Sequence, residues 1–383
     1  MSGSDGSRSQ LLPVLAAFAT LGVMWGVWQV LLADLSGALH LSPGPLGAAL
    51  SIGFVASLPA MVVGGQIADR LGPRTVAVAA GVLLAASLLG FAAVASYALL
   101  VGLLLVFLAA SGVFDMAINA AAIDLEQGSG RRVLPVLHAA FSGGGAVGAI
   151  ATGLLITAGA DFRLVYRGTA LLIIVILASW LTRPGARAPH REERLGARSL
   201  YRNGLLLLLA TIAALSFLSE GAMESWSSIY LRSSLGLSAL LGATGVATFH
   251  AAMLAGRLAT AGVAHRLGRV TTLRGAGILA AAGIALGLAT DLPGLVLGGF
   301  LIVGLALAAS APIAFSLAGD AAPQRAGSAS AVITTIGYGG FLLGPGLVGG
   351  LAEVTSLRLG LLVVAAAGIA VSVLTIGLGR RTG

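Results

Sequence analysis

The sequence contains no cysteine and no lysine, and only 9% of its 383 residues are charged. The lack of cysteine excludes disulfide bonds and thiolate metal sites. A soluble protein carries roughly a quarter of its residues as charged ones, so this chain has too little polar surface to stay folded in water. Because 57% of the residues are apolar, the composition predicts a protein that uses the lipid bilayer as its solvent.

Apolar runs of about 20 residues recur along the whole chain, and each is long enough to cross a hydrocarbon core of ~30 Å. A membrane β-barrel would require short strands of alternating polarity, and the sequence does not show this pattern. The 56 glycines suit helices that pack closely in lipid. We therefore predict an all-α integral membrane protein with twelve transmembrane helices, near residues 11–38, 46–68, 74–96, 98–122, 134–158, 164–182, 202–230, 239–263, 270–290, 294–318, 328–352 and 357–379.

All 22 basic residues are arginine, and they are distributed unevenly between the two sides of the predicted helices. With the N-terminus inside, 18 arginines, Arg257 among them, are expected on the cytoplasmic side. The positive-inside rule then places both termini in the cytoplasm and predicts a multi-pass protein of the cytoplasmic (inner) membrane. The net charge of +8 follows from this topology, so a nucleic-acid partner is not expected. The four arginines expected outside are Arg163, Arg167, Arg232 and Arg358.

The chain divides into two halves that are related by an internal repeat. A polar connector at 183–201 separates residues 1–182 from residues 202–383, each half with six predicted helices. A constant offset of 196 residues relates DRLG at Asp69–Gly72 to HRLG at His265–Gly268, and Asp124 to Asp320. One offset that holds across several helices indicates duplicated architecture. The same offset relates Gly143, Gly144, Gly148 and Gly153 to Gly339, Gly340, Gly344 and Gly349.

The loop GQIADRLGPR after the second predicted helix resembles the signature G-x-x-x-D-R-x-G-R-R of the major facilitator superfamily (MFS). Gly65, Asp69, Arg70, Gly72 and Arg74 match this signature, and Pro73 departs from it. The resemblance implies two pseudo-symmetric six-helix halves with the substrate site between them near the midplane. It also implies that Asp69 caps a helix of the other half and forms a latch that breaks as the halves move. The alternative is an ordinary turn that carries topology charges.

Helix 11 contains GFLLGPGLVGG, at residues 340–350, which resembles a glycine-proline motif that many drug antiporters carry in helix 5. Here the fifth helix has Ala149 where that proline would stand. Glycines at four-residue spacing let helices approach closely, and Pro345 can bend its own helix. The interpretation favoured by this placement is close helix packing.

Several polar side chains lie inside the fourth and fifth predicted helices. Asp115 and Asn119 are four residues apart on helix 4, and His138 and Ser142 are four apart on helix 5. Counting from the intervening loop sets Asn119 level with His138, and Asp115 level with Ser142. A carboxyl group in lipid needs a partner or a proton, so these residues are candidates either for a structural cluster or for a part in transport.

The first and seventh helices carry the other candidates. Trp25 and Gln29 share a face of helix 1, and Trp28 lies about a quarter-turn away. SEGAMESW in helix 7 brings Glu220 and Glu224 onto one face, beyond the midplane on the outer side, and the offset relates Glu224 to Trp28. By resemblance, helices 1, 4, 7 and 10 line the cavity. The predicted cavity set is completed by Trp226, His250 and Tyr338, although packing is the alternative for His250.

Nothing in the sequence favours catalysis, a cofactor or a metal. Four stretches (GVW, DMAIN, HAAFSGGG and EGAMESWS) resemble a bacterial MFS branch whose substrates are largely unassigned. We predict a monomeric, proton-coupled transporter in contact with membrane lipid, with Glu220, Glu224 and Asp115 as proton sites. Efflux-type antiport of a cationic, neutral or amphiphilic solute is favoured, because the halves show no matching intramembrane arginines. The alternatives are a proton-coupled or facilitative importer of a neutral metabolite such as a sugar, and a receptor or scaffold that does not transport.

Overall fold

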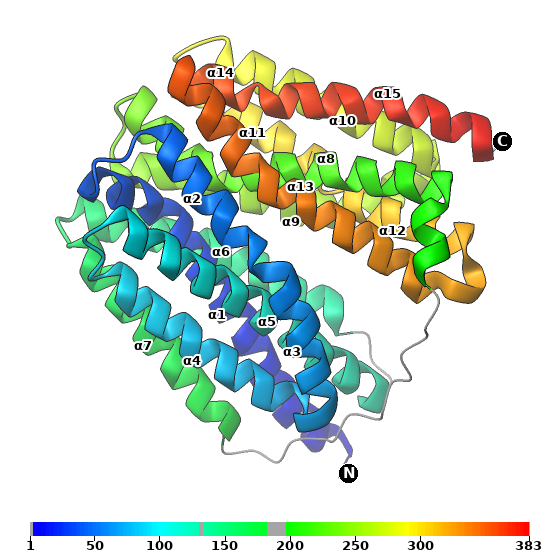
Figure 1. Ribbon diagram of the computed structural model, residues 1–383, viewed down its shortest axis with the longest axis horizontal. Helices are drawn as coiled ribbons and strands as arrows, with labels where there is room; N and C mark the ends of the chain where they lie inside the picture. The colour runs from blue at the N-terminus through cyan, green and yellow to red at the C-terminus, as the bar shows by residue number, and fades with distance from the viewer. Residues whose placement is uncertain (1–2, 130–132, 182–196, 383) are drawn as a thin grey trace. The chain divides into compact units, whose positions relative to one another are not determined.

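The computed structural model describes residues 3–129, 133–181 and 197–382, and Figure 1 shows the order of its elements. One compact unit consists of Met1–His40 and Ile52–Glu192, and the other of Leu41–Ser51 and Glu193–Gly383. The predicted connector lies mostly outside the described residues, so its boundaries stay a prediction. The segment Leu41–Ser51 comes from the first half of the sequence but belongs with the second unit. The sequence did not predict this assignment.

The first half of the chain contains six helical stretches, the second of which is divided into α2 and α3. Five of the six are long and apolar enough to cross a membrane. The order along the chain is α1 (Gly3–Ala38), α2 (Pro43–Val55), α3 (Ser57–Leu71), α4 (Pro73–Phe91), α5 (Tyr97–Ser129), α6 (Leu134–Thr157) and α7 (Phe162–Leu181). The polar first residues of the chain are helical from Gly3, so they continue α1 rather than precede it.

The second unit begins with the short helix η1 (Ala197–Arg202) and repeats the six-helix order. It contains α8 (Gly204–Ile229), the π-helical turn η2 (Tyr230–Ser234), α9 (Ala239–Leu267), α10 (Arg269–Leu288), α11 (Pro293–Leu307), α12 (Ser310–Ala321), η3 (Pro323–Arg325), α13 (Ala326–Val354), α14 (Leu357–Leu361) and α15 (Val363–Thr382).

The predicted helices are all present in the described residues. Eleven helical stretches are long and apolar enough to cross a membrane, and the remaining predicted helix, the sixth at 164–182, corresponds to α7, Phe162–Leu181. Three predicted helices contain a break that was not predicted: between α2 and α3, between α11 and α12, and between α14 and α15. The first two breaks each precede a proline. A proline ring clashes with the carbonyl group four residues earlier. Pro59 thus explains the end of α2 at Val55, and Pro312 the end of α11 at Leu307.

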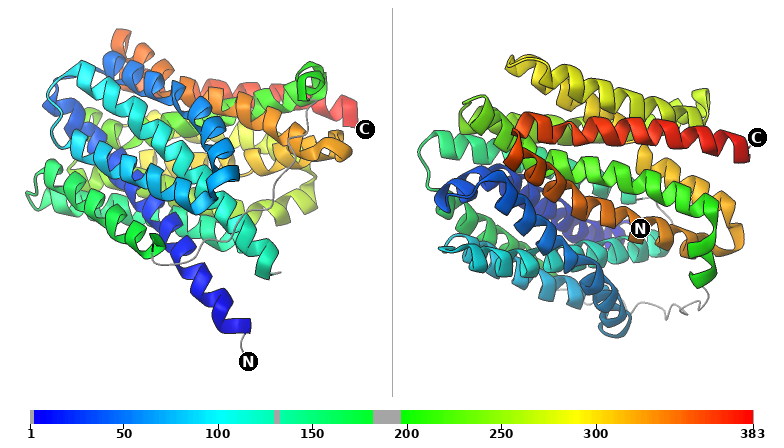
Figure 2. Two further views of the ribbon diagram at one scale, coloured as in Figure 1. Left: turned by 60° about the horizontal axis from the view of Figure 1, so that its bottom comes forward. Right: turned by 45° about the horizontal axis from the view of Figure 1, so that its top comes forward.

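The repeat is visible in how the longest helix pairs pack. In the first unit α1 packs most closely on α6, and in the second α8 packs most closely on α13 (Figure 2). A Cβ atom on Gly144 would lie 2.3 Å from a carbonyl oxygen of α1, and one on Gly340 would lie 1.9 Å from a carbonyl oxygen of α8. Gly148 and Gly344, one turn further, are each 2.4 Å from such an oxygen by the same measure. The predicted duplication and the predicted packing role of the helix-11 glycines are confirmed.

The two DRLG-type loops also share a backbone conformation. Gly72 has φ 85° and ψ 147° between α3 and α4, and Gly268 has φ 80° and ψ 147° between α9 and α10. A residue with a Cβ atom is strained at these φ values. The last glycine of each loop is therefore needed for the turn itself.

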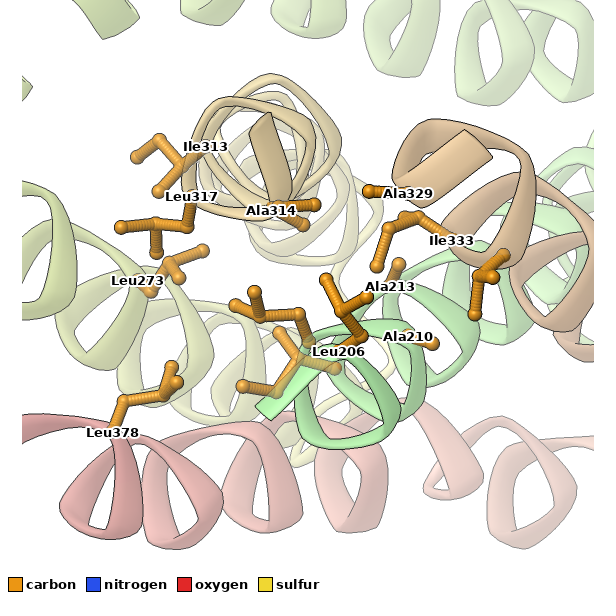
Figure 3. Close-up of a cluster of buried hydrophobic side chains, with 14 of the residues drawn as sticks. Leu206, Ala210, Ala213, Leu273, Ile313, Ala314, Leu317, Ala329, Ile333 and Leu378 are labelled. Carbon is orange, nitrogen blue, oxygen red and sulfur yellow. The ribbon is translucent and has the colours of Figure 1, made fainter. Parts of the chain in front are cut away.

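A cluster of buried apolar side chains fixes the helices of the second unit at the end where α8 begins. Leucine, isoleucine and alanine side chains from five helices converge there (Figure 3). Burying apolar surface between helices holds α8 in place relative to α10, α12, α13 and α15. The labelled members are Leu206, Ala210, Ala213, Leu273, Ile313, Ala314, Leu317, Ala329, Ile333 and Leu378.

Candidate functional site

The central feature of the second unit is an ion pair inside the membrane span. Glu220 lies sixteen residues after Gly204 and fourteen before Ser234, at the middle of the span that α8 and η2 form. Its Oε1 atom is 3.5 Å from Nη2 of Arg257 on α9. The carboxylate side chain is 16% exposed and the guanidinium side chain 36% exposed. The two charges therefore lie close together in a region where lone charges are costly.

The position of Arg257 corrects the sequence analysis, which placed this residue on the cytoplasmic side. Arg257 lies six residues before the end of the predicted eighth helix at 263, and ten residues before the end of α9 at Leu267. Glu220 lies at the middle of the span Gly204–Ser234, whereas the sequence predicted a position beyond the midplane. An arginine within a membrane-spanning helix is thus present in the second unit, although the sequence shows no matching pair of such arginines in the two halves.

Glu224 and His250 lie near this pair along their helices. Glu224 is half-buried and follows Glu220 by one turn of α8. His250 is 3% exposed and precedes Arg257 by seven residues on α9, so both face the same side of that helix. The structure thus pairs one of the two predicted helix-7 carboxylates, Glu220, with an arginine of the following helix.

The two aromatic candidates of the second unit have packing partners on another helix. Trp226 is fully buried, and its Nε1–H donates a 3.2 Å hydrogen bond to the carbonyl oxygen of Pro345 on α13. The ring of Tyr338 meets the ring of Phe217 edge-on at 6.0 Å. Trp226 therefore lies in the interface between α8 and α13, and Tyr338 lies half-buried beside α8.

In the first unit, Asp115 and Asn119 form one polar group on α5. The amide nitrogen of Asn119 donates to Oδ1 of Asp115 at 3.0 Å and to the Asp115 carbonyl oxygen at 2.9 Å. On α6, the hydroxyl of Ser142 donates to the carbonyl oxygen of His138 at 3.2 Å, and the His138 ring packs edge-on against Phe18 of α1. These bonds run within each helix, and α6 packs mainly on α1 rather than on α5. The expected pairing of Asn119 with His138 and of Asp115 with Ser142 stays a prediction.

The candidates on α1 belong to an aromatic cluster. Trp25 meets Trp28 edge-on at 5.2 Å, and Trp28 lies 5.3 Å from Phe107 of α5. Trp28 and Gln29 are buried inside the unit, whereas Trp25 is half-buried. Sequence spacing gave the shared face of Trp25 and Gln29, but not which neighbouring helix covers it.

The predicted latch loop lies between α3 and α4. Asp69 and Arg70 are exposed at the end of α3, and Arg74 is half-buried in the first turn of α4. A side chain at Gly65 would meet no atom within 4 Å. The conformation of Gly72 shapes the turn, while the proposed latching by Asp69 stays a prediction.

The second unit has an ion pair in the corresponding loop that the sequence analysis missed. Arg269 directly follows Gly268, and its Nη1 atom pairs with Asp320 and donates to the hydroxyl of Ser316 on α12. The 196-residue offset could have indicated this pair, because it relates Asp320 to Asp124 and Arg269 to Pro73. Arg269 stands where the first loop has Pro73, and this difference could have suggested a charged contact in the second loop.

The described residues can thus bind charge but offer no cluster for a metal. Within residues 3–129, 133–181 and 197–382, no group of three or more histidine, aspartate or glutamate side chains could hold an ion. A half-buried carboxylate such as that of Glu220 can instead bind a proton, a guanidinium group or a polar solute in turn. Such groups inside membrane helices typically mark solute and ion pathways.

Comparisons with known proteins agree on one family. The model of the Major Facilitator Superfamily matches residues 14–345. The chain is 32% identical to an uncharacterized MFS-type transporter of Yersinia pestis, over 91% of this chain and 90% of that protein. It is 30% identical to the uncharacterized transporter y4wD of Sinorhizobium fredii, over 90% and 92% respectively. Among solved structures, a mutant of the nucleoside transporter NupG aligns with a TM-score of 0.85 at 16% identity, covering 96% of this chain and 99% of that one.

Proposed function

Because this chain belongs to the major facilitator superfamily, we propose that it is a proton-coupled secondary transporter. It moves a small organic solute across the cytoplasmic membrane by alternating access. Both termini lie in the cytoplasm, and the protein works as a monomer surrounded by lipid. The observation that carries the proposal is the pairing of Glu220 with Arg257 at the middle of the α8 span.

The physical argument concerns what a proton does to this ion pair. Two opposite charges in a membrane interior stabilise each other, and removing one leaves the other uncompensated. A proton on Glu220 makes the carboxyl group neutral and releases Arg257. A solute group that binds either side chain then competes with the proton or completes the site. Proton binding and solute binding are thereby coupled through one pair of residues.

We favour antiport, in which a cationic, neutral or amphiphilic solute leaves the cell as protons enter. Glu224 in the second unit and Asp115 in the first supply further carboxylates, and Trp25 supplies an aromatic face. A cationic solute group would displace Arg257 from Glu220, and the arriving proton would displace the solute.

The second candidate is import of a neutral metabolite. It is favoured by the charge balance of Glu220 and Arg257, which cancel each other when paired. The likeness to a nucleoside transporter concerns the fold alone. Export and import can be distinguished in cells by deleting the gene. Loss of an exporter raises the accumulation of its solute, and loss of an importer lowers it.

The test begins with a compound screen by thermal shift on the purified protein. Compounds that raise the unfolding temperature are then measured in proteoliposomes with an imposed pH gradient. We expect Glu220→Gln to abolish gradient-driven transport. Asp161→Asn, which changes an exposed carboxylate outside the membrane spans, should leave it intact. Full gradient-driven transport by Glu220→Gln would disprove the assignment.

A further inference from the structure

Four polar side chains follow one another along α8 and η2 at four-residue spacing. Glu220, Glu224, Ser228 and Arg232, which we call the α8 polar stripe, lie on successive turns. The stripe starts at the ion pair in mid-span and ends in η2, whose last residues are exposed. It therefore connects the middle of the membrane span with one of its surfaces.

The helix opposite the stripe is α9, and its glycines let α8 side chains approach it closely. A Cβ atom on Gly242 would lie 3.3 Å from the Ser228 hydroxyl oxygen and 2.4 Å from Cγ of Arg232. Gly242 therefore faces the surface end of the stripe, and Arg257 faces its mid-span end at Glu220. The two helices run in opposite directions along the whole stripe.

This antiparallel arrangement gives the level of His250. On α9 it lies eight residues after Gly242 and seven before Arg257, about halfway between the two ends of the stripe. The residue of the stripe at that level is Glu224. A histidine accepts a proton on one ring nitrogen and releases one from the other, so Glu224 and His250 form the middle of a path.

The surface half of the stripe contains hydroxyl groups that need water. Ser227, Ser228 and Tyr230 are at most 1% exposed, and their hydroxyl groups have no hydrogen-bond partner among the described residues. By contrast, Ser216 and Ser219 on the same helix donate to backbone carbonyls one turn back. Buried hydroxyl groups without a protein partner are satisfied by ordered water. The π-helical turn η2 lies at the same place, and such turns are frequent at functional sites.

We propose that the α8 polar stripe, together with His250 and the water held by Ser227 and Ser228, is the route by which protons reach the Glu220–Arg257 pair from the η2 side. The proposal rests on the proton coupling proposed above and adds the path and its side of entry. A hydronium ion protonates the Glu224 carboxylate and leaves as water. Glu224 then passes this proton to Glu220, directly or through the two ring nitrogens of His250, and becomes a carboxylate again. Glu220 is neutral at the end, and Arg257 has lost its partner.

Four further charged or titratable groups on helices packed against α8 have contacts of their own, while His265 and Arg266 of α9 lie beyond Arg257, away from η2. The ring of Tyr338 packs against Phe217. The remaining groups are engaged as follows: Asp320 with Arg269, Arg358 with Asp291, and Glu353 with Ser42 and Gly44. The proposed route therefore runs along α8 and α9.

The route is tested without a substrate, by infrared spectroscopy of protein reconstituted in one orientation. An acid step is applied on the η2 side, and the carbonyl stretching band of protonated carboxyl groups is followed in time. The part of the band that is absent from Glu220→Gln belongs to Glu220. We expect Glu224→Gln and His250→Asn to slow its rise at least about tenfold at unchanged final amplitude. Ser216→Ala, on the same helix but off the route, should match the wild type.

The outcomes separate the two proposals. Wild-type rates in both Glu224→Gln and His250→Asn would overturn the route while leaving Glu220 as a proton site. A wild-type band that Glu220→Gln does not reduce would overturn the proton coupling itself.

A second measurement uses the absence of cysteine from the natural chain. We expect Ser228→Cys to react with a small, membrane-impermeant thiosulfonate added on the η2 side, and Ser216→Cys to remain unmodified. Failure of Ser228→Cys to react would overturn the water-filled entry.

Discussion

Glu353 of α13 caps the first turn of α2 through the backbone of Gly44. Its Oε2 atom accepts the Gly44 N–H at 2.7 Å, and its Oε1 atom accepts the Ser42 hydroxyl at 3.0 Å. A carboxylate at a helix N-terminus satisfies free N–H groups and interacts favourably with the helix dipole. This contact helps to explain why Leu41–Ser51 belongs with the second unit.

We expect Glu353→Ala to lower the stability of the protein, by about 1 kcal/mol or less because the site is exposed. Glu353→Gln should lose less, since its amide oxygen can still accept the Gly44 hydrogen bond. The midpoint of thermal unfolding in detergent measures both variants. Equal midpoints for the wild type and Glu353→Ala would contradict the capping role.

The duplicated glycine interface predicts a contrast between adjacent residues. Gly340→Ala should be strongly destabilising, by about 1–3 kcal/mol or more, because its Cβ atom would lie 1.9 Å from the Ala214 carbonyl oxygen. Gly339→Ala is the matched control, since no atom lies within 4 Å of its added Cβ. Gly144→Ala and Gly143→Ala repeat the experiment in the first unit. Equal expression and unfolding temperatures within each pair would show that the helices can separate freely.

The Glu220–Arg257 pair predicts that the two single variants are unequal. Glu220→Gln leaves a guanidinium that stays charged, whereas Arg257→Gln leaves a carboxylate that can become neutral by taking up a proton. We therefore expect Glu220→Gln to be the less stable single variant and the double variant to recover part of the loss. A double-mutant cycle of unfolding temperatures measures this. Simple additivity of the two losses would show that the side chains do not interact.

The turn after α9 predicts a cost for any side chain at its last position. Gly268→Ala places a Cβ atom at φ 80°, and the strain should cost about 1–2 kcal/mol. Gly262→Ala is the control, because it lies within α9 and its Cβ would meet no atom within 4 Å. Unfolding temperatures of the two variants are compared directly. A Gly268→Ala protein as stable as Gly262→Ala would contradict the strain.

The features that the sequence predicted are those that repeat or have a definite length. Apolar run length gave the twelve helices, and the 196-residue offset gave Gly144 and Gly340 as equivalent contact points. The family signature placed Gly72 in the loop where its positive φ is required. Each of these depends on local pattern or on duplication, and neither needs knowledge of which helices are neighbours.

The features that the sequence did not predict depend on helix ends and on neighbours. Arg257 was counted with the cytoplasmic arginines although it falls within the predicted helix 239–263, because run length does not show that its side chain pairs with Glu220. The burial of Trp28 depends on Phe107 of another helix, and the cap on α2 joins Glu353 to a residue about three hundred positions earlier. Loop counting could not show that the His138 ring packs against Phe18 of α1, because that contact depends on which helix lies beside α6.

The open glycines beside the duplicated contacts have a use in measurement. Gly143 and Gly339 are equivalent by the repeat, one in each unit, and each has space around it. Since the natural chain has no cysteine, two substitutions at these positions can carry spin labels or fluorophores without a background signal. The repeat thus provides a symmetric pair of reporter sites from which the distance between the two units can be followed through a transport cycle.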